Sequence, residues 1–464
     1  MSHRLEVSQV VPLPREQVFD FFCRPENLGR ITPADMGFAL RSGDVEMRRG
    51  LRLSYRVRPF AGLPVRWVSE ITEYEPASRF VDAQREGPYA SWVHLHEFSD
   101  EQIGGAPATR VTDRVDYDLP FGFVGELARG LVRRRLLSLF DYRRRAVERL
   151  LPAVVPRNDP LRVVVAGGTG FVGGEIAREL HRRGERVTVL SRSTARARAE
   201  LPDGVSVARA DVRDDGSLRG VLDGADALLV SLAFPNSPME NPRRGHTFEA
   251  VDAAGTERLM AEARRAGVRR VLYVSGAGAA PDAKRHWFRA KWRAEDAVRA
   301  SGLEYTIVRP TWVYGPDDVA LNRFLSFARI LPFVPLTGDG RQALAPVFVS
   351  DVARLAADAL RDPAAVGGVF EVGGPQTLTM REIIRVALRV AGLRRPLLPA
   401  PAPLLKLAAW PLQLLPAPPL TPGAVDFVNQ PATVDVGPLL ARMPRRLTPL
   451  EEGLGTYLGA ARAG

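Results

Sequence analysis

The sequence of 464 residues has little cysteine, little lysine and no long apolar run, and each shortage excludes a class of protein. Its single cysteine, Cys23, cannot form an intrachain disulfide, which excludes a secreted disulfide scaffold and a multi-cysteine zinc site. No stretch approaches the ~20 uninterrupted apolar residues of a membrane-spanning helix. The first residues also lack the apolar core of a signal peptide. We therefore expect a cytoplasmic protein.

Lysine is nearly absent although the chain is strongly basic, with a formal net charge of +11. Of the 64 basic residues only Lys284, Lys291 and Lys406 are lysine, so the other 61 are arginine. The excess charge is spread out, because residues 1–150 contribute 23 basic and 21 acidic residues, a balance of +2, and the remainder contributes +9. Neither part is a basic arm, and we expect no nucleic-acid partner.

A proline-rich segment divides the chain. Residues 151–160 contain three prolines between two strongly patterned regions and are interpreted as a linker. The sequence therefore predicts one domain over residues 1–150 and a larger one over residues 161–464, in which a C-terminal substrate-side cap begins at about residue 375.

The first domain is predicted to be α+β. Residues 4–13 form a strand and residues 14–22 a helix that begins at a proline, and the apolar periodicity of residues 124–150 predicts a long closing helix. Between them, five runs are rich in β-branched and aromatic residues: 51–58, 65–74, 79–83, 91–98 and 109–117. Such a sheet can curl around its helix and enclose a cavity. The arginine triplets 133–135 and 143–145 are expected on the solvated face of the helix.

This region resembles the START-like, polyketide cyclase (SRPBCC) superfamily of ligand-binding proteins. The resemblance rests on residues 14–22, 25–33, 87–89, 92–98 and 112–120. It implies a helix-grip fold and a hydrophobic small-molecule ligand such as a lipid, quinone or polyketide, since members of the superfamily bind ligands of these classes.

One strand of this domain offers candidate ligand contacts. Trp92, His94 and His96 alternate along the strand and therefore share a face, where they are candidates for lining the cavity. Two histidines without a third ligand evident in the sequence do not make a metal site, and we expect no metal.

A glycine motif opens the larger domain. An apolar strand from Arg162 runs into Gly167, Gly170 and Gly173 and then into a helical pattern, the context of a dinucleotide-binding turn. Gly167 permits the tight turn, Gly170 lets the pyrophosphate approach the backbone, and Gly173 lets the helix pack against the strand. Within this motif the predicted cofactor-binding residues also include Thr169, Phe171 and Val172. Further strand–helix alternation predicts an α/β Rossmann fold with a doubly wound parallel sheet.

The residue after the second strand favours NADP(H) over NAD(H). An NAD-specific site usually places a carboxylate there, whereas this sequence has Ser191, Arg192 and Ser193. A guanidinium at position 192 matches a 2′-phosphate with paired donors. The alternative is a solvated arginine in an arginine-rich protein.

The larger domain resembles the atypical and extended branches of the short-chain dehydrogenase/reductase superfamily. The motifs that carry the resemblance are residues 211–214, 255–256, 309–316, 347–352 and 370–374, together with the glycine turn. The resemblance implies that Asp211 meets the adenine amino group. The alternative is an ordinary turn aspartate.

Catalytic members of that superfamily carry Tyr-x-x-x-Lys, and here the corresponding residues are Trp287 and Lys291. An indole N–H does not exchange its proton near neutral pH, so Trp287 cannot be a general acid. The resemblance implies that Lys291 contacts the ribose and that Ser275 is the partner hydroxyl. The alternative for Lys291 is a surface pair with Glu295. The neighbouring His286 points about 100° away on a helix and is a weak substitute acid.

The missing tyrosine, the retained lysine and the glycine motif look most like the subgroup that includes the NADPH-binding accessory subunit of respiratory complex I. Two hypotheses remain open: an NAD(P)H-dependent oxidoreductase or epimerase-like enzyme acting on the hydrophobic ligand, and a non-catalytic nucleotide-sensing or structural protein. The apolar residues 404–415 are expected to be buried as a cap over the substrate cleft. The alternative is that they rest on a membrane surface, which is not the contact we expect. The oligomeric state is open.

Overall fold

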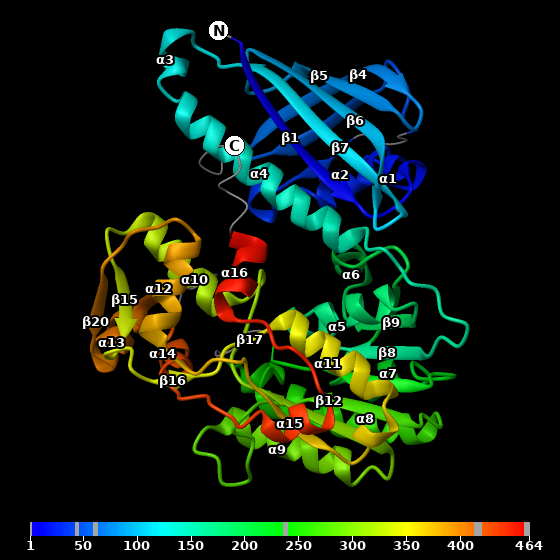
Figure 1. Cartoon of the computed structure of the whole chain (residues 1–464), viewed down its shortest axis with the longest axis vertical. Coiled ribbons are helices and arrows are strands. Elements are labelled where there is room, and N and C mark those ends of the chain that lie inside the picture. Colours follow the sequence, from blue (N-terminus) through cyan, green and yellow to red (C-terminus); the bar gives the residue numbers. More distant parts are fainter. Residues whose placement is uncertain (1, 42–45, 59–63, 235–239, 413–419, 459–464) are drawn as a thin grey trace. The chain divides into compact units, whose positions relative to one another are not determined.

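The structure is a computed structural model that describes residues 2–41, 46–58, 64–234, 240–412 and 420–458 (Figure 1). The chain divides into two compact units, one of residues 1–154 with 198–203 and the other of residues 155–197 with 204–464. Separate groups of buried apolar side chains form the cores of the two units.

The first unit contains an antiparallel seven-stranded sheet in the order β1-β7-β6-β5-β4-β3-β2. Its strands are β1 (His3–Val11), β2 (Ala39–Leu40), β3 (Arg52–Val57), β4 (Val65–Glu75), β5 (Arg79–Glu86), β6 (Ser91–Ile103) and β7 (Ala106–Asp118). All five predicted runs are strands. The hairpin of β6 and β7 is longer than predicted because Gly104 and Gly105, with φ of 57° and 83°, form a two-residue turn that keeps the strands paired up to it.

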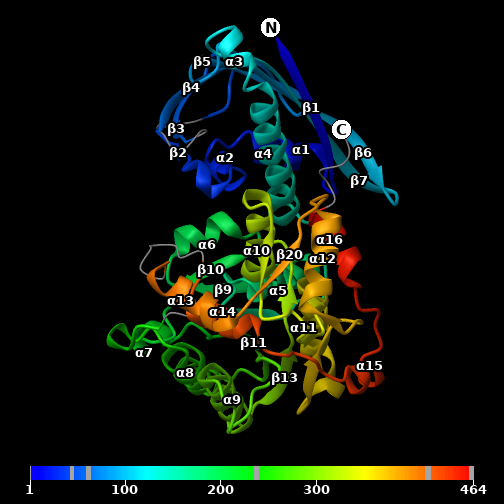
Figure 2. The same ribbon diagram turned by 90° about the vertical axis from the view of Figure 1, so that its left-hand side faces the viewer.

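Four α-helices accompany this sheet: α1 (Arg15–Phe22), α2 (Glu26–Arg30), α3 (Phe123–Glu126) and α4 (Arg129–Leu150). Helix α4 lies along the sheet (Figure 2) and buries an apolar stripe that includes Val132, Leu136 and Phe140. Arg143 continues this stripe and is only 7% exposed, so the expected solvated position is wrong for this arginine. The physical reason is an acidic partner in the sheet, described below.

The second unit is built on a parallel seven-stranded sheet in the order β10-β9-β8-β11-β12-β13-β18. Its strands are β8 (Arg162–Ala166), β9 (Arg186–Ser191), β10 (Ser206–Arg209), β11 (Ala227–Val230), β12 (Arg270–Val274), β13 (Glu304–Pro310) and β18 (Val369–Val372). The order reverses between β8 and β11, which is the arrangement of a Rossmann fold. The central strand β11 is buried along its whole length, as strands covered on both faces are.

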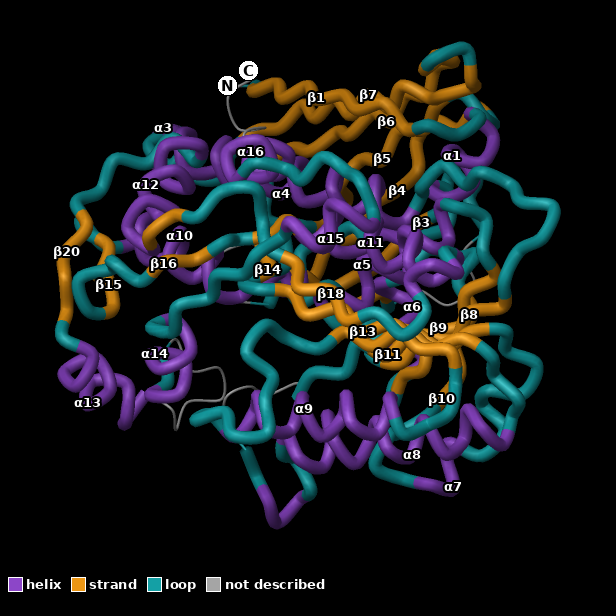
Figure 3. Tube along the Cα trace, turned by 60° about the horizontal axis from the view of Figure 1, so that its bottom comes forward, coloured by secondary structure: helices purple, strands orange, loops and turns teal. Residues whose placement is uncertain are grey.

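Helices cover both faces of this sheet (Figure 3). Helices α5 (Phe171–Arg182) and α11 (Val349–Arg361) pack together on one face, and α8 (Ala254–Arg265) and α9 (His286–Arg299) lie along the other. The connections between the strands contain α6 (Thr194–Glu200), α7 (Asp215–Leu218) and a π-helical turn, η3 (Glu249–Ala253).

The C-terminal part of this unit has its own core, drawn from residues 314–349 and 380–457. Its helices are α10 (Val319–Ile330), α12 (Met380–Val390), α13 (Ala402–Leu412), α14 (Pro422–Val428), α15 (Gly437–Arg442) and α16 (Leu450–Leu458). Short strand pairs join them: β14 (Val313–Tyr314) with β17 (Val347–Phe348), β15 (Val334–Thr337) with β20 (Leu397–Ala400), and β16 (Ala343–Leu344) with β19 (Leu378–Thr379).

Helix α13 differs from its expected burial. Leu404, Leu407 and Trp410 are 62%, 72% and 64% exposed, and Ala409 is buried. The apolar composition therefore predicted more burial than this helix has. Residues 413–415 of the predicted cap lie outside the described residues. None of the described helices is both long enough and apolar enough to span a bilayer.

Candidate functional site

The glycine turn lies at the topological switch point of the parallel sheet, directly after β8. Ligands of open α/β sheets bind in the crevice outside the carboxyl ends of the strands at such a point. Gly167 has a φ of 85°, and a Cβ there would lie 2.2 Å from the Ser231 carbonyl oxygen beyond the end of β11. No side chain fits at this position, so the sequence needs glycine to bring the turn against the neighbouring strand.

The other two glycines differ in what surrounds them. A Cβ at Gly173 would lie 2.3 Å from the Gly167 carbonyl oxygen, so Gly173 packs the start of α5 against the turn. A Cβ at Gly170 would meet only that same oxygen, at 3.2 Å, and the space beyond it is open. Close packing at Gly173 was predicted from the sequence, and the approach of a pyrophosphate to Gly170 stays a prediction.

The first turn of α5 supplies hydrogen-bond donors to this open space. The N-cap residue Gly170 has no capping side chain, and the amides of Phe171, Val172 and Gly173 have no partner within the helix. Thr169 is half-buried in the turn beside them. Free amides and the positive end of the helix dipole together fit the diphosphate of a dinucleotide.

Arg192 and Asp211 follow the next two strands of the sheet. Arg192 is exposed after β9, and Asp211 follows β10. The Asp211 carboxylate accepts hydrogen bonds from Arg213, at 3.0 Å from Nε to Oδ1 and 2.6 Å from Nη2 to Oδ2. Arg213 and then the charge of Arg192 hold the pKa of Asp211 below its usual range. The adenine contact of Asp211 stays a prediction, and Arg213 is a second guanidinium that the sequence analysis did not single out.

Lys291 is held close to the glycine turn. Its ammonium donates to the Leu232 carbonyl oxygen at 2.6 Å and lies 2.9 Å from Asp252 Oδ1. Leu232 follows Ser231, whose carbonyl oxygen faces Gly167. Asp252, in η3, has no exposed surface, and burial raises the pKa of its carboxyl group despite the neighbouring ammonium. Lys291 therefore lies at the crevice, and its ribose contact stays a prediction.

The alternative prediction, a surface pair between Lys291 and Glu295, is wrong. Glu295, one turn further along α9, is fully buried and accepts hydrogen bonds from Arg299 and Arg309, each at 2.6 Å to Oε2. Periodicity alone placed Lys291 and Glu295 together, but the two residues serve different networks.

Trp287 and Ser275, the other two residues at the family's catalytic positions, make no hydrogen bonds with their polar side-chain atoms among the described residues. The Trp287 indole nitrogen has no hydrogen-bond partner among the described residues, and its ring lies 6.1 Å from that of Phe248 and 6.4 Å from that of Phe427. Ser275 is 6% exposed, and its buried hydroxyl has no hydrogen-bond partner within the described part of the chain. Trp287 therefore packs like an aromatic side chain, and the catalytic role of Ser275 stays a prediction.

His286 lies on a neighbouring face of α9. Its Nε2 is 2.8 Å from Glu240, and both residues line a cavity of about 310 Å³ with Arg289 and Arg293. Residues 286, 289 and 293 share one helix face, whereas Lys291 does not belong to it. The structure thus separates His286 from Lys291, as the helical geometry predicted.

In the first unit, Trp92, His94 and His96 share the buried face of β6. Their exposed fractions are 7%, 5% and 6%, and the two imidazole centroids are 3.8 Å apart. The alternation along the strand predicted this common face correctly. Whether these side chains contact a ligand stays a prediction.

The two histidines belong to a buried polar cluster that the sequence analysis missed. His94 Nε2 hydrogen-bonds Asp113 Oδ1 at 2.9 Å, and Arg143 Nη1 lies 3.6 Å from the same oxygen. His96 Nε2 hydrogen-bonds Asp82 Oδ2 at 3.3 Å. Burial, followed by the charge of His96, lowers the pKa of His94 to about 4. The sequence feature that could have predicted this cluster is a set of polar residues at inward-facing positions of β5, β7 and α4.

Comparison with known proteins identifies the second unit. Residues 167–363 match the family model described as NAD(P)H-binding. The match shows that this region is similar to NAD(P)H-binding domains. It is similar to "NADH dehydrogenase [ubiquinone] 1 alpha subcomplex subunit 9, mitochondrial" of Arabidopsis thaliana, with 31% identity over 229 residues, which are 48% of this chain and 56% of that protein.

A second relative and a solved structure agree with this assignment. The "NAD(P)H azoreductase" of Xenophilus azovorans is 28% identical over 235 residues, which are 50% of this chain and 74% of that protein. The crystal structure of triphenylmethane reductase from Citrobacter sp. superposes with a TM-score of 0.52 and 19% identity, covering 64% of this chain and 99% of that one, which shows the shared fold. The chain spans little more than half of the Arabidopsis subunit, 56% of its length.

Proposed function

We propose that the protein binds NADP(H) at the glycine turn and uses it to reduce a hydrophobic, conjugated acceptor such as a quinone. The observation that carries this proposal is the open space at Gly170, which faces three unpartnered amides of α5 at the switch point of the sheet.

A preference for NADP(H) is supported by two guanidinium groups. Arg192 and Arg213 both lie close enough to Asp211 to lower the pKa of its carboxyl group. The exposed guanidinium of Arg192 matches a 2′-phosphate with paired donors, whereas the guanidinium of Arg213 is already hydrogen-bonded to Asp211. Arg213 also neutralises the carboxylate that would otherwise repel that phosphate.

We also propose that the first unit is the START-like, helix-grip domain to which its sequence is similar, and that it holds the hydrophobic ligand. The support is an antiparallel seven-stranded sheet with the 22-residue helix α4 packed along it. Aromatic side chains gather on the inner face, where Trp67, Tyr89 and Trp92 lie within 5.7 Å of one another by ring centroids. Flat apolar rings of this kind suit a planar hydrophobic molecule.

The residues around the crevice favour an acceptor that needs no proton donor from the protein. A bound reduced nicotinamide supplies a hydride. Trp287 cannot donate a proton, and Lys291 already makes contacts with Leu232 and Asp252. A quinone or azo acceptor becomes a stable anion or takes its proton from water, so neither needs a general acid from the chain. The similarity to an NAD(P)H azoreductase agrees with this class of acceptor.

The second candidate is a protein that holds NADP(H) without turning it over. It is favoured by Trp287, which occupies the place of the usual proton donor and packs between aromatic rings. It is also favoured by the similarity to an accessory subunit of NADH dehydrogenase.

The test of nucleotide binding is Gly170→Ala. Gly170 has a φ of −86° and an extended ψ, so alanine keeps the backbone conformation while its methyl group enters the space proposed for the diphosphate. We expect NADPH to bind at least about tenfold more weakly, roughly 1.4 kcal/mol, with little change in the melting temperature. Gly455→Ala in α16, where a Cβ meets nothing within 4 Å, is the matched control and should bind NADPH like the parent. Equal NADPH affinity in both variants contradicts the proposed site.

Turnover separates the two candidate functions. We expect the parent to oxidise NADPH when a quinone is added and not when a simple ketone is added, and Gly170→Ala to lose that activity. If NADPH binds tightly but no quinone or azo compound oxidises it, the reductase function is excluded. The second candidate, a protein that holds NADP(H) without turning it over, then remains.

A further inference from the structure

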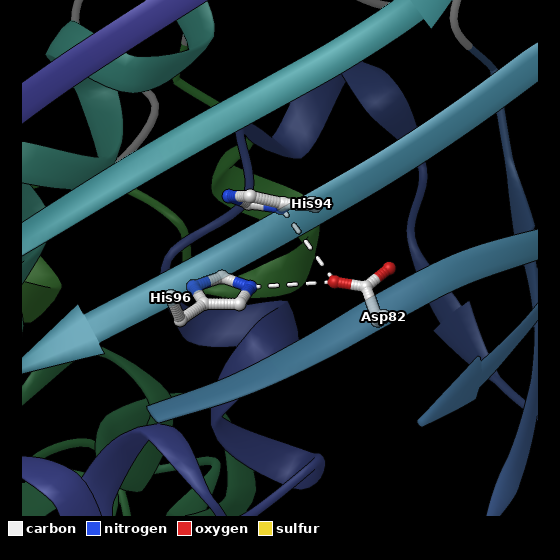
Figure 4. Close-up of side chains that lie close together, drawn as sticks. All are labelled: Asp82, His94 and His96. Atoms are coloured by element: carbon white, nitrogen blue, oxygen red, sulfur yellow. Dashed lines mark hydrogen bonds and ion pairs between the residues drawn. The ribbon is translucent and has the colours of Figure 1, made fainter. Parts of the chain in front are cut away.

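We propose that the first unit contains a binding site for a divalent transition-metal ion of the zinc or ferrous kind, formed by Asp82 Oδ2, His94 Nδ1 and His96 Nε2 (Figure 4). The three side chains come from two neighbouring strands, β5 and β6, and their ligand atoms lie within 4.8 Å of one another. The sequence analysis expected no metal because no third ligand was evident, and Asp82 supplies one. This proposal does not depend on the function proposed for the second unit.

Two of the three separations between the ligand atoms, those that involve Asp82, fit a metal ion. Asp82 Oδ2 lies 3.6 Å from His94 Nδ1 and 3.3 Å from His96 Nε2. Two ligand atoms that are each ~2.1 Å from an ion, at a tetrahedral angle, are about 3.4 Å apart. The first of the observed distances is too long for a hydrogen bond, and both are close to the separation that a shared ion gives.

The other nitrogen of each imidazole ring lies closer to a carboxylate oxygen. His94 Nε2 and His96 Nδ1 lie 2.9 and 2.8 Å from the same oxygen, Asp113 Oδ1. The His94 contact is a hydrogen bond, whereas His96 Nδ1 has no hydrogen-bond partner among the described residues despite its short distance to that oxygen. Each imidazole thus lies between two carboxylates, with Asp113 at the close end and Asp82 at the wide end.

Proton counting favours a cation at the wide end. Two neutral imidazoles carry two N–H groups, but the rings make four contacts with carboxylate oxygens. In two of these four contacts, a nitrogen lone pair would therefore point at a carboxylate oxygen, which is repulsive. A metal ion beside Asp82 removes both conflicts, because each ring then presents a lone pair to the ion. His94 keeps its hydrogen bond to Asp113, and the N–H group of His96 lies beside the same oxygen without completing a hydrogen bond.

The charges nearby place the ion beside Asp82 and away from Asp113. Arg143 Nη1 lies 3.6 Å from Asp113 Oδ1, so a guanidinium already neutralises that carboxylate and repels a second cation there. Asp82 forms no ion pair with an arginine among the described residues, where its charged partners are His94 and His96. Without an ion or an extra proton, the two aspartates and Arg143 leave one net negative charge in the core, which is costly.

Further hydrogen bonds orient the carboxylate of Asp82. Ser69 donates to Asp82 Oδ1 at 3.1 Å, and Trp67 Nε1 donates to the Ser69 hydroxyl oxygen at 3.2 Å. The Tyr55 hydroxyl oxygen lies 3.1 Å from the Ser69 hydroxyl oxygen. Since the Ser69 proton points to Asp82, Tyr55 is the donor of that contact. Asp82 Oδ2 is left for the ion, and Asp113 orients the His94 imidazole by a hydrogen bond, as outer partners do in metal sites.

The proposed site has an open coordination position. Three protein ligands leave a tetrahedral ion one place for water or for an oxygen of a bound ligand. Two histidines and one carboxylate suit zinc or ferrous ions better than calcium or magnesium, which prefer oxygen ligands.

The experiment uses the full, tag-free chain after removal of metal. We expect Zn²⁺ to bind with one ion per chain in calorimetry, and Co²⁺ to give visible d–d absorption that Zn²⁺ displaces. Asp82→Asn keeps the Ser69 hydrogen bond but removes the charged ligand, and it should weaken Zn²⁺ binding at least about tenfold. The matched control Asp116→Asn alters an exposed carboxylate on β7 that pairs with Arg4, and it should leave the affinity unchanged.

A second measurement covers the event that a buried substitution prevents folding. In the Co²⁺ form of the parent, two imidazole N–H signals should be shifted by the paramagnetic ion, one from each histidine. Absence of stoichiometric binding by the parent, equal Zn²⁺ affinity in the two variants, or a Co²⁺ form without shifted imidazole signals would each overturn the proposal. The first outcome would mean that protons alone satisfy the cluster.

Discussion

At the scale of single residues, the sequence was most informative where backbone geometry decides. The roles assigned to Gly167 and Gly173 follow from turn and packing geometry, and the structure places both residues accordingly. The partners of charged side chains were harder to predict. Lys291 pairs with Asp252, which is 39 residues away in the chain, and Asp211 pairs with Arg213. Such partners depend on how loops meet in space, which periodicity along one helix does not encode.

Arg192 offers a prediction at this scale. We expect Arg192→Ala to weaken NADPH binding at least about tenfold and to change NADH binding little, because the lost guanidinium serves only the 2′-phosphate. Affinities for both nucleotides can be measured by calorimetry. The control Arg186→Ala removes an exposed arginine at the opposite end of β9, far from the carboxyl edge, and should alter neither affinity. Equal losses for the two nucleotides would contradict the NADP(H) preference.

At the scale of elements, the sequence predicted the long strands and helices and missed the short ones. The five strand runs and the closing helix of the first unit carry clear periodicity, whereas β2 and α2 have two and five residues. Helix α4 shows that apolar periodicity does not predict which polar residues are buried. Its core stripe contains Arg143, and the facing strand β7 carries Asp113 among buried apolar residues. Two polar residues at inward positions on facing elements are the signal for a buried ion pair.

Asp318 gives a prediction for helix α10. Its carboxylate caps the helix by accepting from the amides of Ala320 and Leu321 at 2.9 and 3.0 Å, and burial raises its pKa to about 6. An unfolded aspartate titrates near pH 4, so the folded state favours the protonated form. This contribution to stability is complete below about pH 4 and is lost as the pH rises through about 6, at a cost of up to about 3 kcal/mol.

Asp318→Asn keeps a capping oxygen and removes the titration. We expect the free energy of unfolding of the variant, relative to the parent, to increase between pH 4 and pH 8 by up to ~3 kcal/mol. Urea unfolding at both pH values measures this difference. A difference between variant and parent that is the same at the two pH values would show that folding does not shift the pKa of this carboxyl group.

At the scale of the whole molecule, the sequence predicted two unlike sheets, and the structure contains one antiparallel and one parallel sheet. The C-terminal assembly was beyond prediction, because most of its paired strands have only two residues and show no periodicity. Its core also joins residues near 320 with residues near 450. Long-range assemblies of short elements leave little trace in local sequence.

Nucleotide binding should stabilise the two units unequally, because their cores are separate. A ligand at 100 times its dissociation constant stabilises the part that binds it by about 2.7 kcal/mol. With saturating NADPH, we expect slower hydrogen exchange in residues 162–174 and 227–232 and unchanged exchange in β1, β6 and β7. Mass spectrometry of the intact chain, digested after labelling, reports both regions. Protection confined to the first unit would contradict binding at the glycine turn.

The pairing of β1 with β7 has a consequence during synthesis. His3 pairs with Tyr117 and Val11 with Thr109, so β1 leaves the ribosome about a hundred residues before the strand that pairs with it. At ~5–20 residues per second this wait lasts several seconds or more. An unpaired strand is a template for wrong association, so nascent chains stalled before residue 106 should require chaperones more than chains released after residue 150.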